Sequence, residues 1–294
     1  KAVGKAKRLP FIEPSADSAL DFVEAVKAKK PFVVVDVETT GLSADNGDRV
    51  CELGAVVLRG GAVVDTFGTL IDPERPVSAG AYAVNRISPA MLAGAPTFGA
   101  VTERFRAMME GAILVAYNAP FDLSFLSMEL RLAGHPAPAN EVVDALPLAR
   151  ALLPGLGRYP QANVARVLGI GSPVTHRALD DALITARIFT MFTSMLKAYD
   201  CGDCADLRRG DLQRVLHAKR TELITEALER RAPIMVRYLS PSDAEITQEV
   251  VIPHEIIGVD GREPSLLAHS PEAGAERRYR IDRLLDLRTL STRP

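Results

Sequence analysis

The stretch from Phe32 to Glu38 constrains the fold more than any other part of this chain of 294 residues. It reads Phe-Val-Val-Val-Asp-Val-Glu, an apolar run that predicts a buried β-strand. Residues two apart on a strand share one face, so Asp36 and Glu38 point to the same side. Burying two carboxylates together is costly unless they are paired or bind a metal ion. The pair therefore indicates a metal site, and the alternative is a solvated strand end.

The order of the expected elements indicates a mixed sheet. After the first strand, residues 50–58 and 62–71 read as two more strands that meet at Gly60-Gly61, a strong hairpin turn signal. Helical patterns then alternate with short apolar strands at residues 113–116 and 142–144. Strands first, and alternating helices and strands afterwards, predict an α/β domain with a mixed sheet of five strands.

Two changes of pattern suggest how the chain is divided. Residues 1–30 read as an N-terminal extension that carries a short amphipathic helix. Composition shifts at residues 198–210, which we interpret as a linker between a first domain, residues 31–197, and a second, residues 211–294. The second domain begins with a charged helix and continues with three β-like stretches, which predicts a small α+β domain.

Charge and composition limit where the chain can act. A formal net charge of -2 at pH 7 gives no overall electrostatic footprint for nucleic acid, so such binding would need local patches or metal ions. The 3 cysteines are too few for a disulfide framework and suit a reducing compartment. Neither a signal peptide nor an apolar run of the ~18 residues that span a membrane is recognisable. We therefore expect a cytoplasmic protein without a membrane partner.

Three further residues, in two later parts of the sequence, carry reactive groups. Asp122 follows a short strand at the start of a helix, where α/β proteins place ligands; alternatively it only caps that helix. His176 lies in a loop, five residues before Asp181 on a long helix. Taken alone, His176 would be read as a surface histidine, and Asp181 as an acid in the first turn of a helix. Together with Asp36 and Glu38, they supply the groups that phosphodiester hydrolysis by two divalent ions requires.

In their order and spacing, these residues resemble the DEDDh family of 3′-to-5′ exonucleases across residues 31–197. The three motifs are Asp-Val-Glu-Thr-Thr-Gly-Leu from Asp36, Asn-Ala-Pro-Phe-Asp ending at Asp122, and His-Arg-Ala-Leu-Asp-Asp from His176 to Asp181. The resemblance implies a ribonuclease H-like fold, in which flanking helices cover a mixed five-stranded sheet. It also implies a catalytic set, which is Asp36, Glu38, Asp122, His176 and Asp181.

The same resemblance implies a role for each residue. The four acids would hold two divalent cations, and oxygen ligands favour Mg²⁺ or Mn²⁺. His176 would deprotonate the attacking water, and the product would be a nucleoside 5′-monophosphate. The Thr39-Thr40 turn would meet the terminal 3′-hydroxyl, and Leu42 would wedge beside the last base. The residues implied in substrate binding are Thr39, Thr40, Leu42, Asn118 and Phe121.

The substrate is less closely defined than the chemistry. We expect degradation of single-stranded DNA or frayed 3′-ends in DNA repair or proofreading, with a polymerase or a repair complex as a partner. An exoribonuclease that trims short RNA is an alternative, because these motifs read the 3′-end and not the sugar. A noncatalytic nucleic-acid-binding accessory module is a second alternative, against which the complete carboxylate set argues.

The C-terminal segment resembles a WYL domain, notably over residues 231–238 and 278–284. Ser265-Leu266-Leu267 stands where that family has its Trp-Tyr-Leu signature, so ligand binding by those residues is not carried over. The basic run near the end predicts nucleic-acid contacts by Arg278, Arg280 and Arg283. The alternative is a solvated strand with internal ion pairs.

Overall fold

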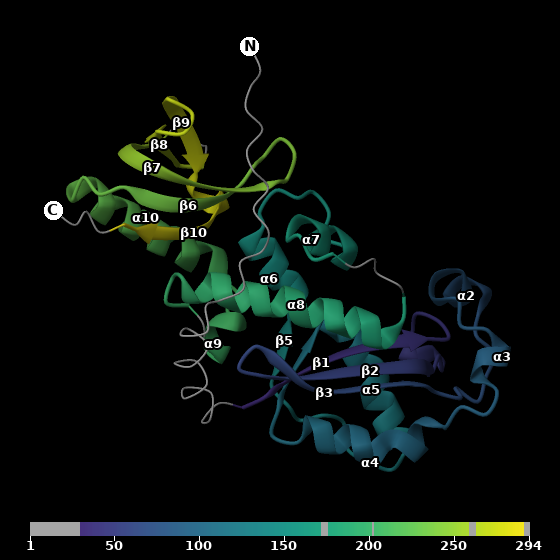
Figure 1. The fold of residues 1–294 in the computed structure, drawn as a ribbon. Coiled ribbons are helices and arrows are strands. Elements are labelled where there is room, and N and C mark those ends of the chain that lie inside the picture. The colour runs from purple at the N-terminus through teal and green to yellow at the C-terminus, as the bar shows by residue number, and fades with distance from the viewer. Residues whose placement is uncertain (1–29, 172–175, 202, 259–262, 291–294) are drawn as a thin grey trace. The chain divides into compact units, whose positions relative to one another are not determined.

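The computed structural model of the protein describes residues 30–171, 176–201, 203–258 and 263–290 (Figure 1). Contacts divide this part of the chain into two compact units. The first runs to Leu146 and includes Ile170–Thr190; the second comprises Pro147–Gly169 and the chain from Met191 onward.

This division passes through two helices, α6 (Ala145–Leu152) and α8 (Ala178–Lys197). The sequence placed one boundary at residues 198–210, where the structure has the short helix α9 (Cys204–Leu207). The domain bounds given above therefore stay a prediction. The helix expected within residues 1–30 lies outside the described residues.

The first unit is built on a five-stranded sheet in the order β3-β2-β1-β4-β5. The central strand β1 pairs antiparallel with β2 and parallel with β4, so the predicted mixed sheet is confirmed. The bounds are β1 (Phe32–Thr39), β2 (Val50–Arg59), β3 (Ala62–Leu70), β4 (Ile113–Ala116) and β5 (Val142–Asp144).

Helices cover both faces of this sheet (Figure 1). On one face, α4 (Phe98–Met109) and α5 (Ala119–Leu132) bury their phenylalanines in one core with the odd-numbered valines of β1. On the other face lies α8, whose Phe189 packs edge to face on Phe32 with ring centroids 4.9 Å apart. Three short elements join β1 to β2 and β3 to α4, namely η1 (Ala44–Asn46), α2 (Ala79–Asn85) and α3 (Pro89–Leu92).

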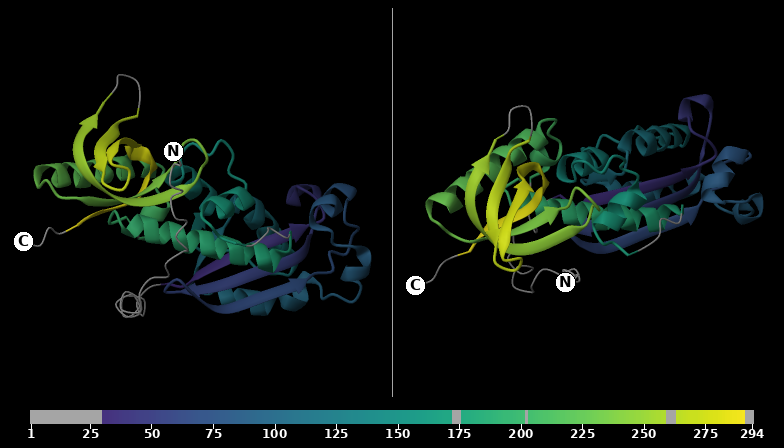
Figure 2. Two further views of the ribbon diagram at one scale, coloured as in Figure 1. Left: turned by 45° about the horizontal axis from the view of Figure 1, so that its top comes forward. Right: turned by 90° about the horizontal axis from the view of Figure 1, so that it is seen from above.

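The second unit contains an antiparallel sheet in the order β10-β6-β7-β8-β9, which Figure 2 shows strongly curled (green to yellow). The helix α10 (Leu212–Glu229) precedes it, as predicted, and its buried Arg220 donates from Nη1 to the carbonyl oxygen of Asp282 at 3.0 Å. The remaining bounds are α7 (Gln161–Val167), β6 (Ile234–Leu239), β7 (Ile246–Ile257), β8 (Ser265–Ser270), β9 (Ala275–Arg280), η2 (Ile281–Arg283) and β10 (Leu284–Thr289).

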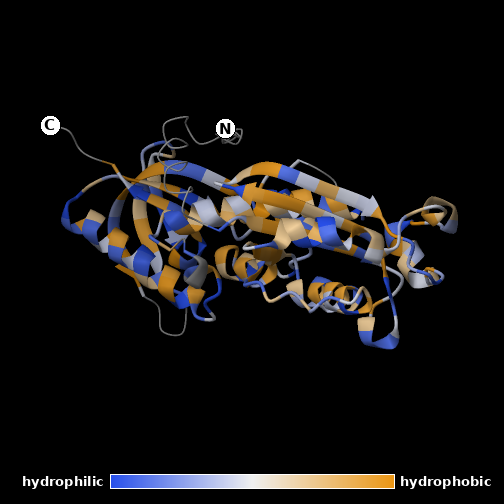
Figure 3. Cartoon of the chain, turned by 90° about the horizontal axis from the view of Figure 1, so that it is seen from below, coloured by the Kyte–Doolittle hydropathy of each residue, from blue (hydrophilic) through white to orange (hydrophobic). Residues whose placement is uncertain are grey.

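Hydropathy varies along every element of the fold. Strands and helices alike carry both hydrophobic and hydrophilic residues (Figure 3). Among the helices that the structure describes, none combines the length and the apolar character that crossing a membrane requires.

Candidate active site

Two acids on β1 form the floor of the site. Asp36 and Glu38 lie on the face of β1 that α8 covers, because the odd-numbered valines turn the other way into the core. On the neighbouring strand β2, Gly54 stands opposite Asp36, and Glu52 stands opposite Glu38. The two acids therefore share a face as predicted, and a further carboxylate lies beside them.

Asp122 reaches this floor from the first turn of α5. Its Oδ1 accepts a hydrogen bond from the main-chain nitrogen of Val37 at 3.1 Å, between Asp36 and Glu38 in sequence. This N–H is available because β4 pairs with β1 only as far as Val34. The buried carboxylate of Asp122 therefore joins α5 to β1 and does more than cap its own helix.

The turn before α5 holds Asp122 in place. Asn118 adopts a left-handed backbone with φ 68°, and its main-chain nitrogen donates to Oδ1 of Asp144 at 3.0 Å. Asn118 is exposed, and the ring of the half-buried Phe121 packs against that of Phe125 with centroids 5.1 Å apart. Both residues therefore flank Asp122, and their predicted contact with a substrate stays a prediction.

The helix α8 brings the third motif to Glu38. Ligand atoms of Glu38, His176 and Asp181 lie within 4.8 Å of one another, close enough to share one cation. Asp181 is buried, whereas its neighbour Asp180 is exposed. His176 is also exposed and has a positive φ of 53°, so it stands at the open side of the cluster. Residues from both ends of the domain therefore meet, as the motifs predict.

Crowding of carboxylates sets the electrostatics of this cluster. Burial, and then the charges of Asp122 and Glu38, raise the pKa of Asp36 well above its usual range. Burial raises the pKa of Asp122 to about 8, and burial with the charge of Asp181 raises the pKa of Glu38 to about 7. A divalent cation would offset this repulsion, and carboxylate oxygens are the ligands that Mg²⁺ and Mn²⁺ prefer. The donor set thus fits divalent cations.

In a chelator, the free energy of unfolding should fall as the pH rises from about 5 to about 8. The folded protein holds protons on Asp36, Glu38 and Asp122 at pH values where the unfolded chain has released them, so a rising pH favours unfolding. We expect Tm to drop by roughly 5–10 °C over this range and to recover with Mn²⁺. Thermal unfolding in EDTA and in Mn²⁺ measures both effects.

Asp36→Asn is the control for this pH dependence, because it removes one carboxylate from the cluster and should flatten the slope. A wild-type Tm in EDTA that stays level or rises between these pH values would contradict the crowding of the carboxylates.

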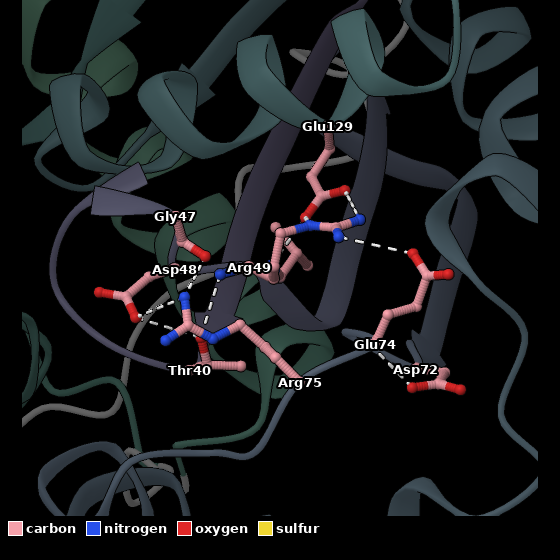
Figure 4. A network of polar contacts seen from close by, with 9 residues as sticks. Thr40, Gly47, Asp48, Arg49, Asp72, Glu74, Arg75 and Glu129 are labelled. Atoms are coloured by element: carbon pink, nitrogen blue, oxygen red, sulfur yellow. Dashed lines mark hydrogen bonds and ion pairs between the residues drawn. The ribbon is translucent and has the colours of Figure 1, made fainter. Parts of the chain in front are cut away.

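A polar network holds the segment after β1 (Figure 4). Oγ1 of the buried Thr40 accepts from the main-chain nitrogen of Arg49 at 3.0 Å, and the main-chain nitrogen of Thr40 donates back to the carbonyl oxygen of Arg49 at 2.9 Å. The guanidinium of Arg49 donates to both oxygens of Glu129 at 2.8 and 2.9 Å. Glu129 lies on α5, seven residues after Asp122. The same network therefore joins the turn at Thr39-Thr40 to α5.

The substrate-binding residues predicted in this turn differ in exposure. Thr39 and Thr40 are buried, and Oγ1 of Thr39 donates to the carbonyl oxygen of Gly41 at 2.6 Å. From α2, Asn85 donates to the carbonyl oxygen of Thr39 at 3.2 Å. Leu42, by contrast, is 87% exposed. The polar groups of this turn are thus already bonded within the protein, so its contact with a 3′-hydroxyl stays a prediction, whereas Leu42 offers its side chain.

Sequence reasoning missed Glu52, although a signal for it was present. Like Asp36, it is an acid within an apolar run, here Val-Cys-Glu-Leu-Gly-Ala-Val-Val, where burial is costly without a partner. The partner is Arg177, whose Nη2 lies 2.6 Å from Oε1 of Glu52. The third motif contains this arginine, but its pairing depends on a strand far away in the sequence.

The three arginines proposed for nucleic-acid contact differ in their surroundings. Arg278 is exposed on β9. Arg280 donates to both oxygens of Asp282 at 3.0 and 2.7 Å. Arg283 is only 5% exposed, and its Nη1 donates to the carbonyl oxygen of Leu239 at 3.5 Å. We therefore retain the proposal for Arg278 and Arg280 and not for Arg283, whose guanidinium lies in the interior.

A mixed sheet with this cluster of carboxylates and a histidine is the arrangement of an exonuclease domain. Residues 33–189 match the exonuclease family, and the chain belongs to it. The predictions of an enzyme of the exonuclease class and of a ribonuclease H-like fold are confirmed. Membership of this family implies that the activity depends on divalent metal ions. Residues 220–289 match the WYL domain, so the second resemblance is also confirmed.

Relatives and solved structures agree with this assignment. The DNA polymerase III subunit epsilon of Treponema pallidum is 38% identical over 172 residues, which cover 58% of this chain and 80% of that protein. The 3′-5′ exonuclease DinG of Bacillus subtilis is 35% identical over 181 residues, which cover 62% of this chain but only 19% of DinG. A structure of E. coli exonuclease I with an oligonucleotide shares the fold, with a TM-score of 0.50 and 16% identity over 82% of this chain and 55% of that one.

Proposed function

We propose that this chain removes nucleotides from the 3′-end of single-stranded DNA, or from frayed 3′-ends, by hydrolysis. The observation that carries the proposal is the meeting of Glu38, His176 and Asp181 within 4.8 Å, on a floor that Asp36 and Asp122 complete. The similarity to a DNA polymerase III subunit and to a 3′-5′ exonuclease supports degradation from the 3′-end and DNA as the substrate.

The residues divide the chemical work. Asp36, Glu38, Asp122 and Asp181 would hold two divalent cations, Mg²⁺ or Mn²⁺, which supply positive charge and Lewis acidity at the phosphate. An imidazole nitrogen of His176 takes the proton from the attacking water, since this side chain is exposed beside the buried acids. Hydrolysis on the 5′ side of the last nucleotide then releases a nucleoside 5′-monophosphate.

Substrate placement would come from the turn after β1. The exposed side chain of Leu42 would offer an apolar surface for the terminal base, and the Thr39-Thr40 turn would meet the 3′-hydroxyl. Because the polar network through Arg49 and Glu129 holds this turn, the 3′-end would meet a preformed surface.

Hydrolysis of matched DNA and RNA oligomers tests the proposal. Each carries a 5′-label and the same base sequence, with either a free 3′-hydroxyl or a blocked 3′-end. We expect stepwise shortening of the free DNA strand in Mn²⁺, release of nucleoside 5′-monophosphates, and at least about tenfold slower cleavage of the blocked strand. Gel electrophoresis and chromatography of the products measure these results.

Three outcomes would change the assignment. Preferential shortening of RNA would identify an exoribonuclease. Internal cuts, or equal cleavage of the blocked strand, would contradict action from the 3′-end. Binding of both oligomers without hydrolysis in any divalent metal would identify a nucleic-acid-binding module.

We further propose that the WYL domain helps to hold the strand through Arg278 and Arg280, and that the protein works in the cytoplasm with a polymerase or a repair complex. The similarity to a DNA polymerase III subunit supports the choice of partner. In the same assay, Arg278→Ala with Arg280→Ala should raise KM and leave kcat unchanged. An unchanged KM at every salt concentration would end this part of the proposal.

A further inference from the structure

The buried carboxylate of Glu52 has no place in the proposed ligand set, yet it lies directly beside it. Glu52 is 5% exposed on β2 and stands opposite Glu38 on β1. Among the described residues, the cluster that could hold a cation contains Glu38, His176 and Asp181 but not Glu52. A further buried carboxylate beside acids that already repel one another requires a specific reason.

Both oxygens of Glu52 are engaged by the residues that open α8. Arg177 donates from Nε at 3.0 Å to each oxygen and from Nη2 at 2.6 Å to Oε1. The main-chain nitrogen of Ala178 donates to Oε2 at 3.1 Å. Arg177 and Ala178 lie between His176 and Asp181 in sequence, so one carboxylate holds the segment that carries both.

The sheet beneath this segment has room for it because two glycines lack side chains. A Cβ on Gly54 would stand 2.2 Å from the carbonyl oxygen of Ala178, and a Cβ on Gly68 would stand 2.8 Å from the side chain of Leu179. The start of α8 therefore lies flat against β2 and β3. The glycines allow this close approach, and the bidentate ion pair adds a directional contact that defines the position of the segment.

We propose that Glu52 is a positioning residue, which holds the start of α8 through Arg177 and Ala178 so that Asp181 and His176 face Glu38 at the separation that a shared cation requires. The inference rests on the proposed function. The primary effect of Glu52 is on metal binding, and its effect on hydrolysis follows from that effect on metal binding. Residues that orient metal ligands typically change metal affinity or activity by about 10–100-fold when they are replaced.

Glu52→Gln tests this role in the full chain. The glutamine keeps the size and one acceptor for Ala178, but its amide nitrogen cannot accept from Arg177. By calorimetry with Mn²⁺ alone, we expect the Kd to rise by about 10–100-fold. In the hydrolysis assay, kcat should fall, KM for the oligomer should stay within about twofold, and high Mn²⁺ should restore kcat. Arg177→Lys, which keeps the charge but loses the bidentate contact, should have an intermediate Kd.

Glu249→Gln is the matched control, because Glu249 is also a buried carboxylate that pairs with an arginine. Its Oε1 lies 3.1 Å from Nη1 of Arg277, in the second sheet. This variant should bind Mn²⁺ as the wild type does. Tm in EDTA, measured for every variant, separates a loss of folding from a loss of metal affinity.

Two results with the variants would overturn the inference about Glu52 alone. The first is a Glu52→Gln protein that binds Mn²⁺ as tightly as the wild type. The second is equal loss of Mn²⁺ affinity in Glu52→Gln and Glu249→Gln. A wild type that binds Mn²⁺ but cleaves no oligomer would refute the proposed function alone, since the calorimetric comparison would still decide the role of Glu52. A wild type without Mn²⁺ binding would refute both.

Discussion

Asp181→Asn and Asp180→Asn, changes at adjacent positions of α8, should give opposite results in the hydrolysis assay. Asp181 is buried beside Glu38 and His176, whereas Asp180 is exposed. We expect Asp181→Asn to lower kcat by roughly 1,000-fold or more, because a residue that merely orients metal ligands already accounts for about 10–100-fold. Asp180→Asn should keep kcat within about twofold, as expected of a surface substitution.

The thermal stability of these two variants distinguishes the loss of a metal ligand from a loss of folding. In EDTA, Asp181→Asn removes a charge that raises the pKa of both Asp36 and Glu38, so Tm at pH 8 should rise while activity is lost. A variant that had simply unfolded would show the opposite change in Tm. Equal activity of the two variants would contradict the assignment of Asp181 as a metal ligand.

Gly54→Ala should destabilise the protein more than the same change at Gly68, the other glycine in the strands of the first sheet. The new Cβ would stand 2.2 Å from the main-chain oxygen of Ala178, so α8 would have to move away from β2. Overpacking typically costs about 1–3 kcal/mol, and backbone cannot rotate aside as a side chain can. We expect a loss of about 3 kcal/mol, or roughly 6–12 °C in Tm, together with weaker Mn²⁺ binding.

Gly80→Ala is the control for this substitution. Gly80 lies within α2, nothing stands within 4 Å of an added Cβ, and a helix favours alanine over glycine. We expect a Tm that is unchanged or slightly raised. If thermal unfolding in the presence of EDTA gave the same Tm for Gly54→Ala as for the wild type, the close contact between β2 and α8 would be wrong.

Much of the sheet was predictable because its signals are local. The hairpin at Gly60-Gly61 follows from turn chemistry, and the shared face of Asp36 and Glu38 follows from the period of two along a strand. The helix that begins after Asn118 (α5) and the long helix that ends at Lys197 (α8) follow from their apolar spacing. Each of these features depends on neighbours within a few residues, so sequence alone specifies it.

Contacts between distant elements were not predictable in the same way. The bond from Val37 to Asp122 exists because β4 stops pairing with β1 at Val34, and no pattern in the sequence marks that point. The interior position of Arg283, whose type and surroundings suggested a surface charge, depends on contacts with distant residues such as Leu239 on β6. Burial is a property of the whole packed unit.

By itself, the sequence determined which chemical groups this protein brings to its site, their order, and the family to which it belongs. Only the tertiary structure decided how those groups are held. Glu52 and Arg177 are 125 residues apart, and their pairing exists only because bare glycine backbone lets α8 lie flat on β2. The physical reason is that a charge buried in a protein takes its partner from whichever element packs against it, and that choice is made when the sheet and the helices come together.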